Sequence, residues 1–220
     1  MKQVQLGRTG LVCSQIGLEL SPIRQYSFAE SRDILQQAIQ TGVTFFDLGL
    51  PDRETQKRIA RGIAGSRDQL VLAGSFVPST VRKLETDLEW MLRDLKTDYL
   101  DLLQIHDPDV ILRPGETSGL YDQLLKIQEK GYIRYIGITT GDPRMAMDAL
   151  EYGWYDTIQY PWGPDSTDSE LTVLSYCAEA EVGSISVPDG RFSERKQRWA
   201  RHYPQHLMLY MLDPETIFLP

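Results

Sequence analysis

Three side chains that can exchange protons stand at or near the ends of apolar runs. Asp47 follows "VTFF", His106 follows "LDLLQI", and Glu19 lies near the end of "QIGLEL". Neighbouring carboxyl groups raise the pKa of one of them and an imidazole titrates near neutral pH, so the set favours acid/base catalysis by Asp47 and His106, with Glu19 beside the substrate. Structural alternatives remain open, because Asp47 could cap a loop or pair with Arg24 or Arg53. His106 could be an ordinary core residue, and Glu19 could face outward into a helix contact.

Aromatic residues near the same run ends could shape a binding pocket. Tyr160 and Trp162 in "TIQYPW" could form an apolar wall for a flat substrate, or they could simply cover the end of the fold. Tyr26, on the loop after residues 15–20, could supply a phenol to the substrate site. The stretch "GRFSERKQRWARHYPQH" carries five Lys and Arg residues, which a solvated helix face explains better than an anion site.

The alternation of apolar runs and amphipathic segments predicts the fold. Strands are predicted at 15–20, 43–50, 70–76, 100–107, 135–140, 157–162, 182–188 and 216–220. Helices are predicted at 28–41, 53–64, 79–95, 117–130, 142–152, 169–181 and near 191–203. Continuous apolar strands between helices form a parallel sheet, and eight of them predict an α/β fold, a (β/α)8 TIM barrel. The earlier "VQLGRTGLVCS" predicts a β-hairpin that plugs the bottom of the barrel.

The C-terminal part of the chain departs from this alternation. "HLMLYML", residues 206–212, has helical spacing and leads into the predicted eighth strand at 216–220. The residues of the chain then run out before the helix that follows strand eight in a complete barrel of this kind. We expect the missing helix to leave an apolar face uncovered, which a homodimer would bury.

Bulk composition limits the class of protein. The 220 residues are 41% hydrophobic and carry a net charge of -8, without a linker or low-complexity run, so we expect a single domain over 1–220. An acidic surface argues against nucleic acid as a partner. The N-terminus has no secretory signal, and no apolar stretch approaches the roughly 18 residues of a membrane span. Cys13 and Cys177 have no metal-ligand spacing and suggest a reducing compartment, so we expect a cytoplasmic protein that uses no metal.

Several segments resemble one known family. "QLGRTGLVCSQIGLE", "AIQTGVTFFDLG", "RKLETDLEWMLRDLKTDYLDLLQIHDPD", "LLKIQEKGYIRYIGITT", "DTIQYPW" and "LMLYMLDPETIFLP" are similar to successive parts of the aldo-keto reductases, over almost the whole chain. The resemblance implies a barrel that reduces carbonyls with NADPH. It also implies a site in which a Tyr gives a proton, a Lys and an Asp tune that Tyr, and a His orients the substrate carbonyl.

The resemblance carries over to only part of that set. Asp47 and His106 stand at the family's Asp and His positions. The family's Tyr falls five residues after its Asp, where this chain has Asp52, and the family's Lys belongs to a pair that here is Gly74 and Ser75. We expect Ser75, like Glu19 and Tyr26, to line the substrate site instead.

The resemblance also predicts which residues face the nicotinamide. Gln159 matches the family's Gln, Thr139 and Thr140 replace a Ser-Asn pair, and Ser186 replaces the stacking aromatic. The family's clamp on the 2'-phosphate follows strand eight, beyond Pro220. We therefore expect no cofactor, and assign Thr139, Gln159, Tyr160 and Trp162 to substrate.

These expectations lead to one main functional hypothesis and two alternatives. The main hypothesis is a cofactor-independent lyase, isomerase, cyclase or dehydratase acting on a small organic metabolite. One alternative is a non-catalytic binding subunit, and the other is a residual NADPH-dependent oxidoreductase with Tyr26 or water as its proton donor.

Overall fold

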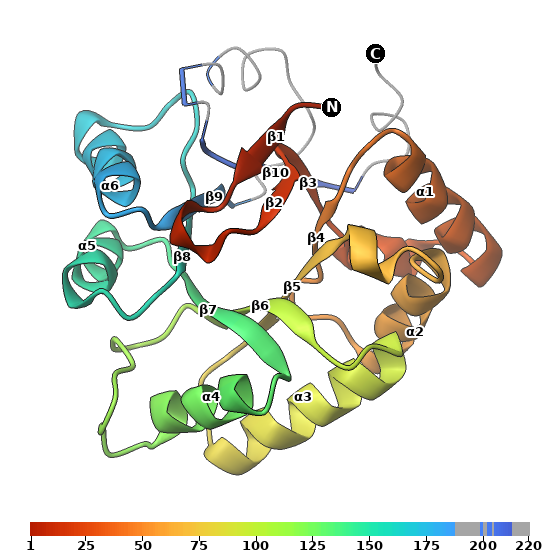
Figure 1. Ribbon diagram of the computed structural model, residues 1–220, viewed down its shortest axis with the longest axis horizontal. Coiled ribbons are helices and arrows are strands. Elements are labelled where there is room, and N and C mark those ends of the chain that lie inside the picture. The colour runs from red at the N-terminus through yellow and green to blue at the C-terminus, as the bar shows by residue number, and fades with distance from the viewer. Residues whose placement is uncertain (188–198, 200–201, 204, 213–220) are drawn as a thin grey trace.

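Eight parallel strands form the centre of the molecule (Figure 1). The computed structural model describes residues 1–187, 199, 202–203 and 205–212. The strands are hydrogen-bonded in the order β10-β3-β4-β5-β6-β7-β8-β9. A parallel bridge between Ile185 and Leu207 joins the two ends of this order, so the sheet curls into the predicted barrel.

Strands and helices alternate along the chain as the apolar runs predict. The barrel strands are β3 (Ile16–Glu19), β4 (Phe45–Asp47), β5 (Val71–Phe76), β6 (Leu100–His106), β7 (Ile133–Thr139), β8 (Thr157–Tyr160), β9 (Gly183–Ser186) and β10 (Met208–Met211). The α-helices are α1 (Phe28–Gln40), α2 (Arg53–Gly62), α3 (Val81–Leu95), α4 (Leu120–Glu129), α5 (Pro143–Tyr152) and α6 (Asp168–Glu179). The described residues also form three short 3-10 helices, η1 (Gly7–Thr9), η2 (Ser21–Gln25) and η3 (Arg67–Gln69). None of these helices has both the length and the apolar character of a transmembrane span.

Capping side chains set the helix starts. Ser27 opens α1 with a capping box, and Asp142 accepts a backbone hydrogen bond at the start of α5, where Pro143 occupies the first turn. The sequence predicted that Ser79 opens the third helix, but Thr80 is its N-cap. The boundary moves because the Thr80 hydroxyl accepts a hydrogen bond from a backbone amide in the first turn.

The eighth strand lies earlier in the chain than predicted. Residues 206–212, for which helical spacing predicted a helix, contain β10. This strand pairs in parallel with β3 through four residue pairs, from Met208 with Ile16 to Met211 with Glu19. The predicted strand at 216–220 and most of the predicted helix near 191–203 lie outside the described residues.

The position of β10 removes the basis of the predicted uncovered face. Met208 and Tyr210 are 1% and 2% exposed, so these two side chains are covered within the chain. Residues 213–220 follow the eighth strand, so the expectation that the chain ends with that strand was wrong. The homodimer stays a prediction that no contact tests.

A hairpin closes one end of the barrel, as predicted. β1 (Gln3–Gln5) pairs antiparallel with β2 (Val12–Ser14), and both lie across the barrel in Figure 1. The hairpin buries four apolar side chains against the barrel floor: Val4, Leu6, Leu11 and Cys13 pack with Phe45, Val71, Ala73, Leu102, Ile185, Leu207 and Leu209. Gly7 fits the turn because its φ is +50° and an added Cβ would lie 2.2 Å from the carbonyl oxygen of Glu181.

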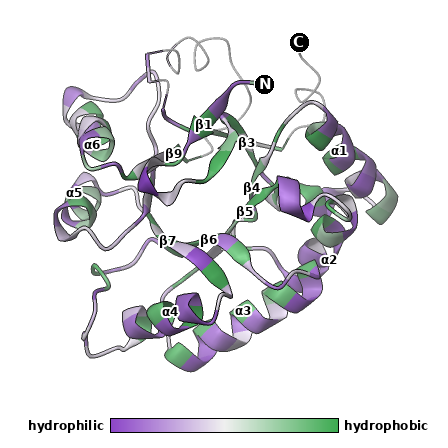
Figure 2. Cartoon of the chain, viewed as in Figure 1, coloured by the Kyte–Doolittle hydropathy of each residue, from purple (hydrophilic) through white to green (hydrophobic). Residues whose placement is uncertain are grey.

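The helices form the outer layer. Figure 2 shows hydrophobic residues concentrated on the barrel-facing sides of the helices and hydrophilic residues on their outer faces. In α3, buried Leu84, Leu88, Met91 and Leu95 follow the helical period, whereas Trp90 between them is 41% exposed. These buried residues belong to an outer apolar cluster that lies between the helices and the strands. An inner cluster lies at the hairpin end of the barrel.

We predict that the hairpin contributes stability as a packed floor. Changing Leu11, which is 5% exposed, to Ala should lower the free energy of unfolding by roughly 2–4 kcal/mol, because a buried side chain leaves a cavity. Changing the adjacent Val12, which is 54% exposed, to Ala should cost less than about 1 kcal/mol. Urea unfolding followed by circular dichroism measures both, and equal losses would contradict the packed floor.

Candidate functional site

Asp47 ends β4 inside the barrel. Phe45 belongs to the inner cluster and Phe46 to the outer one, so alternation directs Asp47 inward. Its side chain is 4% exposed and accepts two hydrogen bonds, one at Oδ1 from the Gly49 amide (2.8 Å) and one at Oδ2 from Gln159 Nε2 (3.0 Å). Burial raises the pKa of Asp47, and the two hydrogen bonds oppose that rise.

Gln159 connects Asp47 to two further strands. Its Oε1 accepts hydrogen bonds from Thr139 Oγ1 (2.7 Å) and Gln104 Nε2 (3.4 Å), and Gln104 Oε1 accepts one from Thr157 Oγ1 (3.3 Å). All five side chains are buried, so this polar network crosses the barrel from β4 to β6, β7 and β8. We call Asp47, Gln159, Thr139, Gln104 and Thr157 the interior network.

The interior network depends on a glycine. An added Cβ at Gly137 would lie 1.9 Å from Gln104 Oε1 and 2.2 Å from Thr157 Oγ1. A side chain on this inward position of β7 would therefore displace both polar groups. Gln104 and Thr157 were missed by the sequence analysis, although an amide inside the apolar run "LDLLQIHD" is a signal that could have found Gln104.

Glu19 also faces the barrel interior. An added Cβ at Gly17 would meet Phe45, Leu207 and Leu209 of the floor, and Glu19 lies two residues further on the same face of β3. The strand register pairs Glu19 with Asp47 on β4. The alternative of an outward-facing Glu19 is therefore wrong.

The carboxyl group of Glu19 is only half satisfied. Its Oε1 accepts hydrogen bonds from the Ser21 amide (2.9 Å) and the Ser21 hydroxyl, whereas its buried Oε2 has no hydrogen-bond partner among the described residues. Burial raises the pKa of Glu19, the Ser21 bonds lower it, Asp47 raises it, and Arg24 lowers it. Glu19 and Asp47 thus form a buried carboxyl pair.

His106 ends β6 on the same inner face as Gln104. Its side chain is 37% exposed, and its Nε2 lies 3.5 Å from Asp107 Oδ2. Asp107 has a φ of +41°, a region that non-glycine residues rarely adopt, and its amide donates to the Thr139 carbonyl. Strained backbone of this kind concentrates at functional sites, and here it follows the imidazole at the end of the strand.

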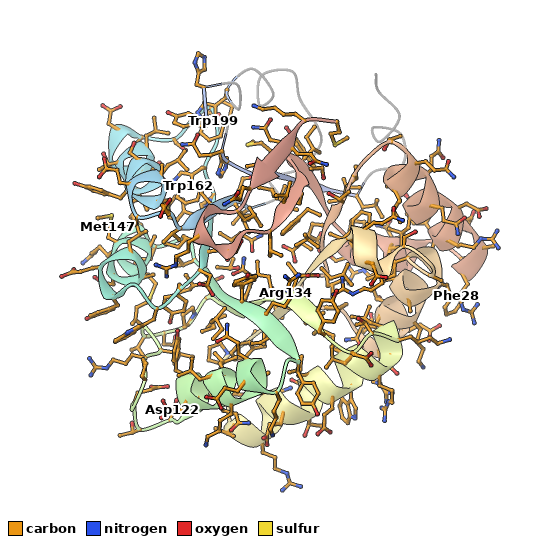
Figure 3. The ribbon with its side chains drawn as sticks, viewed as in Figure 1. Phe28, Asp122, Arg134, Met147, Trp162 and Trp199 are labelled. Carbon is orange, nitrogen blue, oxygen red and sulfur yellow. The ribbon has the colours of Figure 1, made fainter. Side chains whose placement is uncertain are left out.

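Two predicted substrate residues lie outside the barrel. The Tyr160 hydroxyl donates to Glu170 Oε1 (3.0 Å) and Trp162 Nε1 donates to the Glu170 carbonyl (2.9 Å), and both rings are 1% exposed. Figure 3 shows Trp162 between α6 and the strands. The predicted apolar wall for a flat substrate is therefore wrong, because Tyr160 and Trp162 face the helix layer.

The remaining predicted residues differ in their relation to the interior network. Ser75 is buried on β5 beside Gln104 in the strand register, and Thr140 Oγ1 accepts from the Asp142 amide at the start of α5. Tyr26 follows η2, and its carbonyl accepts a hydrogen bond from Arg58. No described contact joins the Tyr26 hydroxyl to the interior network.

Asp52 has a structural role at the start of α2. Asp52, at the position expected for a Tyr, is the N-cap of α2 and accepts hydrogen bonds from the amide and hydroxyl of Thr55. Among the described residues, His, Cys, Asp and Glu side chains form no group of three that could hold a metal ion. The described site brings together two buried carboxyl groups, an imidazole and two amides.

We predict that the interior network is a major stabilising feature. Changing Gln159 to Leu should lower the free energy of unfolding by about 2–4 kcal/mol, because Asp47 Oδ2 loses its donor inside the barrel. The same change at exposed Gln36 should cost less than about 0.5 kcal/mol. Denaturant unfolding of the two variants checks this, and similar costs would refute the network's role.

The buried carboxyl pair predicts an unusual pH dependence. Because the folded-state pKa of Glu19 is raised above its ordinary 4.5, wild-type protein loses stability as pH rises through that pKa. The stability of Glu19→Gln relative to wild type should therefore increase as pH rises above the ordinary 4.5. The stability of Glu30→Gln relative to wild type should change with pH in the opposite direction below the ordinary pKa of 4.5, because the capping box lowers the pKa of Glu30. Thermal unfolding at several pH values measures both slopes, and parallel slopes would contradict the raised pKa of Glu19.

Sequence comparison identifies relatives of this chain. Aldo-keto reductase YhdN of Bacillus subtilis (strain 168) is 24% identical over 204 residues, which cover 84% of this chain and 61% of that protein. L-galactose dehydrogenase of Arabidopsis thaliana is 27% identical over 205 residues, which cover 83% of this chain and 63% of that protein. The chain thus spans less than two thirds of the length of these relatives.

Structure comparison supports the barrel. An aldo-keto reductase from Klebsiella pneumoniae in complex with NADPH has a TM-score of 0.79 at 21% identity, covering 98% of this chain and 87% of that one. The holo form of aldo-keto reductase AKR11C1 from Bacillus halodurans has a TM-score of 0.78 at 15% identity, covering 99% and 88%. At these identities the likeness establishes the fold.

The comparisons contradict the main functional hypothesis. The relatives are named as reductases and a dehydrogenase, so a cofactor-independent lyase, isomerase, cyclase or dehydratase was the wrong expectation. These names also give no support to a non-catalytic binding subunit. The model of the aldo/keto reductase family matches residues 15–203, more than half of the sequence. This chain therefore belongs to the aldo/keto reductase family.

Proposed function

We propose that the protein is an NADP(H)-dependent oxidoreductase that interconverts a carbonyl and an alcohol on a small organic molecule. The observation that carries the proposal is the interior network, which lies inside the barrel of a family whose relatives are named as reductases and dehydrogenases. Asp47, His106, Thr139 and Gln159 stand at the carboxyl ends of their strands, where barrels of this kind hold their sites.

The described residues fit the carboxamide end of a nicotinamide cofactor. A carboxamide offers two N–H donors and one carbonyl acceptor, so its binding site needs both kinds of partner. Thr139 has a hydroxyl, and Gln159 has an amide nitrogen and oxygen on the inner face of the barrel. We assign Thr139 and Gln159 to this end, where the cofactor would supply a hydride.

The other residues then have distinct tasks. Asp47 fixes the Gln159 amide by accepting from its Nε2, so the Gln159 Oε1 is directed toward Thr139. His106, partly exposed at the end of β6, can donate a hydrogen bond to a substrate oxygen. The hairpin floor closes the opposite end of the barrel, which limits entry of water and strengthens electrostatic interactions within the site.

We also propose a cytoplasmic location. Cys13 and Cys177 are free and buried, and burial raises the pKa of both thiols to about 12. Two thiols without a disulfide are typical of a reducing compartment.

Cofactor binding tests the proposal. Titration of the full chain with NADPH should quench tryptophan fluorescence and saturate in the micromolar range, at a free energy of about -8 kcal/mol. Thr139→Val should weaken binding by roughly tenfold, because it removes one hydrogen-bonding hydroxyl at nearly constant side-chain volume. Gln36→Leu, an exposed control on α1, should leave the titration unchanged. Absence of saturation at millimolar NADPH would overturn the proposed function.

A further inference from the structure

The buried carboxyl pair contains one oxygen that lacks a partner. Glu19 is 6% exposed, its Oε1 is bonded to Ser21, and its Oε2 has no hydrogen-bond partner among the described residues. An ionised carboxylate that leaves one oxygen unsolvated in a low-dielectric interior is costly, whereas a proton on that oxygen removes the charge. The geometry therefore assigns the proton of the pair to Glu19 Oε2.

Asp47 has the complementary arrangement. Both of its oxygens accept hydrogen bonds, one from the Gly49 amide and one from the Gln159 amide. Burial raises the pKa of Asp47, and these two donors oppose that rise, whereas no described donor would stabilise a charge on Glu19 Oε2. The pair therefore divides into one acid, Glu19, and one base, Asp47.

Gly49 brings the two carboxyl groups together. Its amide donates to Asp47 Oδ1, and an added Cβ would lie 2.8 Å from Glu19 Oε1. With a φ of +59°, Gly49 also adopts a conformation that suits glycine. The loop after β4 therefore approaches both carboxyl groups.

We propose that Glu19 is the proton donor of the carbonyl reduction, with Asp47 as the neighbour that keeps it protonated. This inference rests on the proposed function. The Glu19 Oε2–H bond breaks as an O–H bond forms on the substrate oxygen, while the carbonyl carbon receives a hydride from the reduced nicotinamide, which is thereby oxidised. Glu19 is left as a carboxylate and regains its proton from solvent.

Burial is the largest cause of the raised pKa of Glu19, and charged groups on the neighbouring elements adjust it. Asp47 on β4 raises the pKa of Glu19, and exposed Arg24 on η2 lowers it. On the other side, β10 pairs Met211, which has no titratable group, with Glu19. The pH at which Glu19 loses its proton should therefore move in opposite directions when Asp47 and Arg24 are neutralised.

The first test measures Glu19 without turnover. Carbon-13 NMR of protein labelled at the Glu side-chain carboxyl, with Glu19→Gln to assign the signal, should show Glu19 titrating above the ordinary 4.5. Arg24→Gln should move that titration to higher pH, and Asp47→Asn should move it to lower pH. A Glu19 that titrates at or below the ordinary value would overturn the inference even where NADPH binds.

The second test measures turnover with NADPH and a panel of aldehydes and ketones. Glu19→Gln should lower kcat by about a hundredfold or more, with NADPH binding unchanged, because a general acid contributes on that scale. Wild-type kcat should fall as pH rises through the Glu19 titration measured by NMR, and Arg24→Gln should shift this profile upward. Glu30→Gln on α1 serves as the control and should retain wild-type kcat.

The outcomes separate the two proposals. NADPH binding together with wild-type turnover in Glu19→Gln would overturn Glu19 as the donor and leave the oxidoreductase proposal intact. Absence of NADPH binding would remove both. Circular dichroism shows whether Glu19→Gln is folded. If it is not folded, the pH profile of kcat for Arg24→Gln, a change at an exposed position, decides the inference.

Discussion

Closure of the barrel between β9 and β10 is the constraint on which the rest of the structure depends. Leu207 donates its amide to the Ser184 carbonyl (3.1 Å) and accepts from the Ser186 amide (2.9 Å), while Ser186 Oγ accepts from the Leu209 amide (2.8 Å). β10 then pairs with β3, so neither strand is left as an edge. Without this closure, β9 and β10 would be the two edges of an open sheet.

Closure gives the barrel interior a gradient of polarity along its axis. At the hairpin end, Phe45, Leu102 and Leu209 pack as a dry floor, and one step along the strands the interior network begins. The same alternation of side chains places Phe45 in the floor and Asp47 in the network, two residues apart on β4. The floor excludes water from below, which strengthens the hydrogen bonds of the network and makes an uncompensated charge costly. The raised pKa values of Asp47 and Glu19 follow from that enclosure.

Much of this arrangement follows from sequence pattern, and its errors have physical causes. Apolar runs located seven barrel strands, and Asp47 and His106 were correctly expected at strand ends. Residues 207–212 form an apolar run that fits either a helix or a buried strand, so periodicity alone cannot separate the two. The decision comes from the register with β3, a contact between segments far apart in the sequence.

The wrong assignment of Tyr160 on β8 arose from the alternation of side chains along a strand. Gln159 faces inward, so alternation directs Tyr160 outward, where its hydroxyl meets Glu170 on α6. Assigning both residues to one site ignored that alternation. The sequence also left open whether Glu19 on β3 points inward. Gly17, two residues earlier on the same face, decides this, because floor residues fill the space beside it. Hydrogen-bond pairing, such as Gln104 with Thr157 across the barrel, is set by closure and has no local signal.

The protonation chemistry of the described tyrosines explains why a carboxyl group suits the role of acid here. Burial and the hydrogen bond to Glu170 together raise the pKa of Tyr160 to about 12, so this phenol is a poor acid at neutral pH, and it also lies outside the barrel. Burial also raises the pKa of Tyr121 and of Tyr155, and their hydroxyls are bound to backbone carbonyls. Burial moves the pKa of a phenol further above neutral pH, whereas it moves the pKa of a carboxyl group up toward neutral pH. The dry floor that makes a buried tyrosine a weaker acid therefore makes Glu19 an acid that keeps its proton at higher pH.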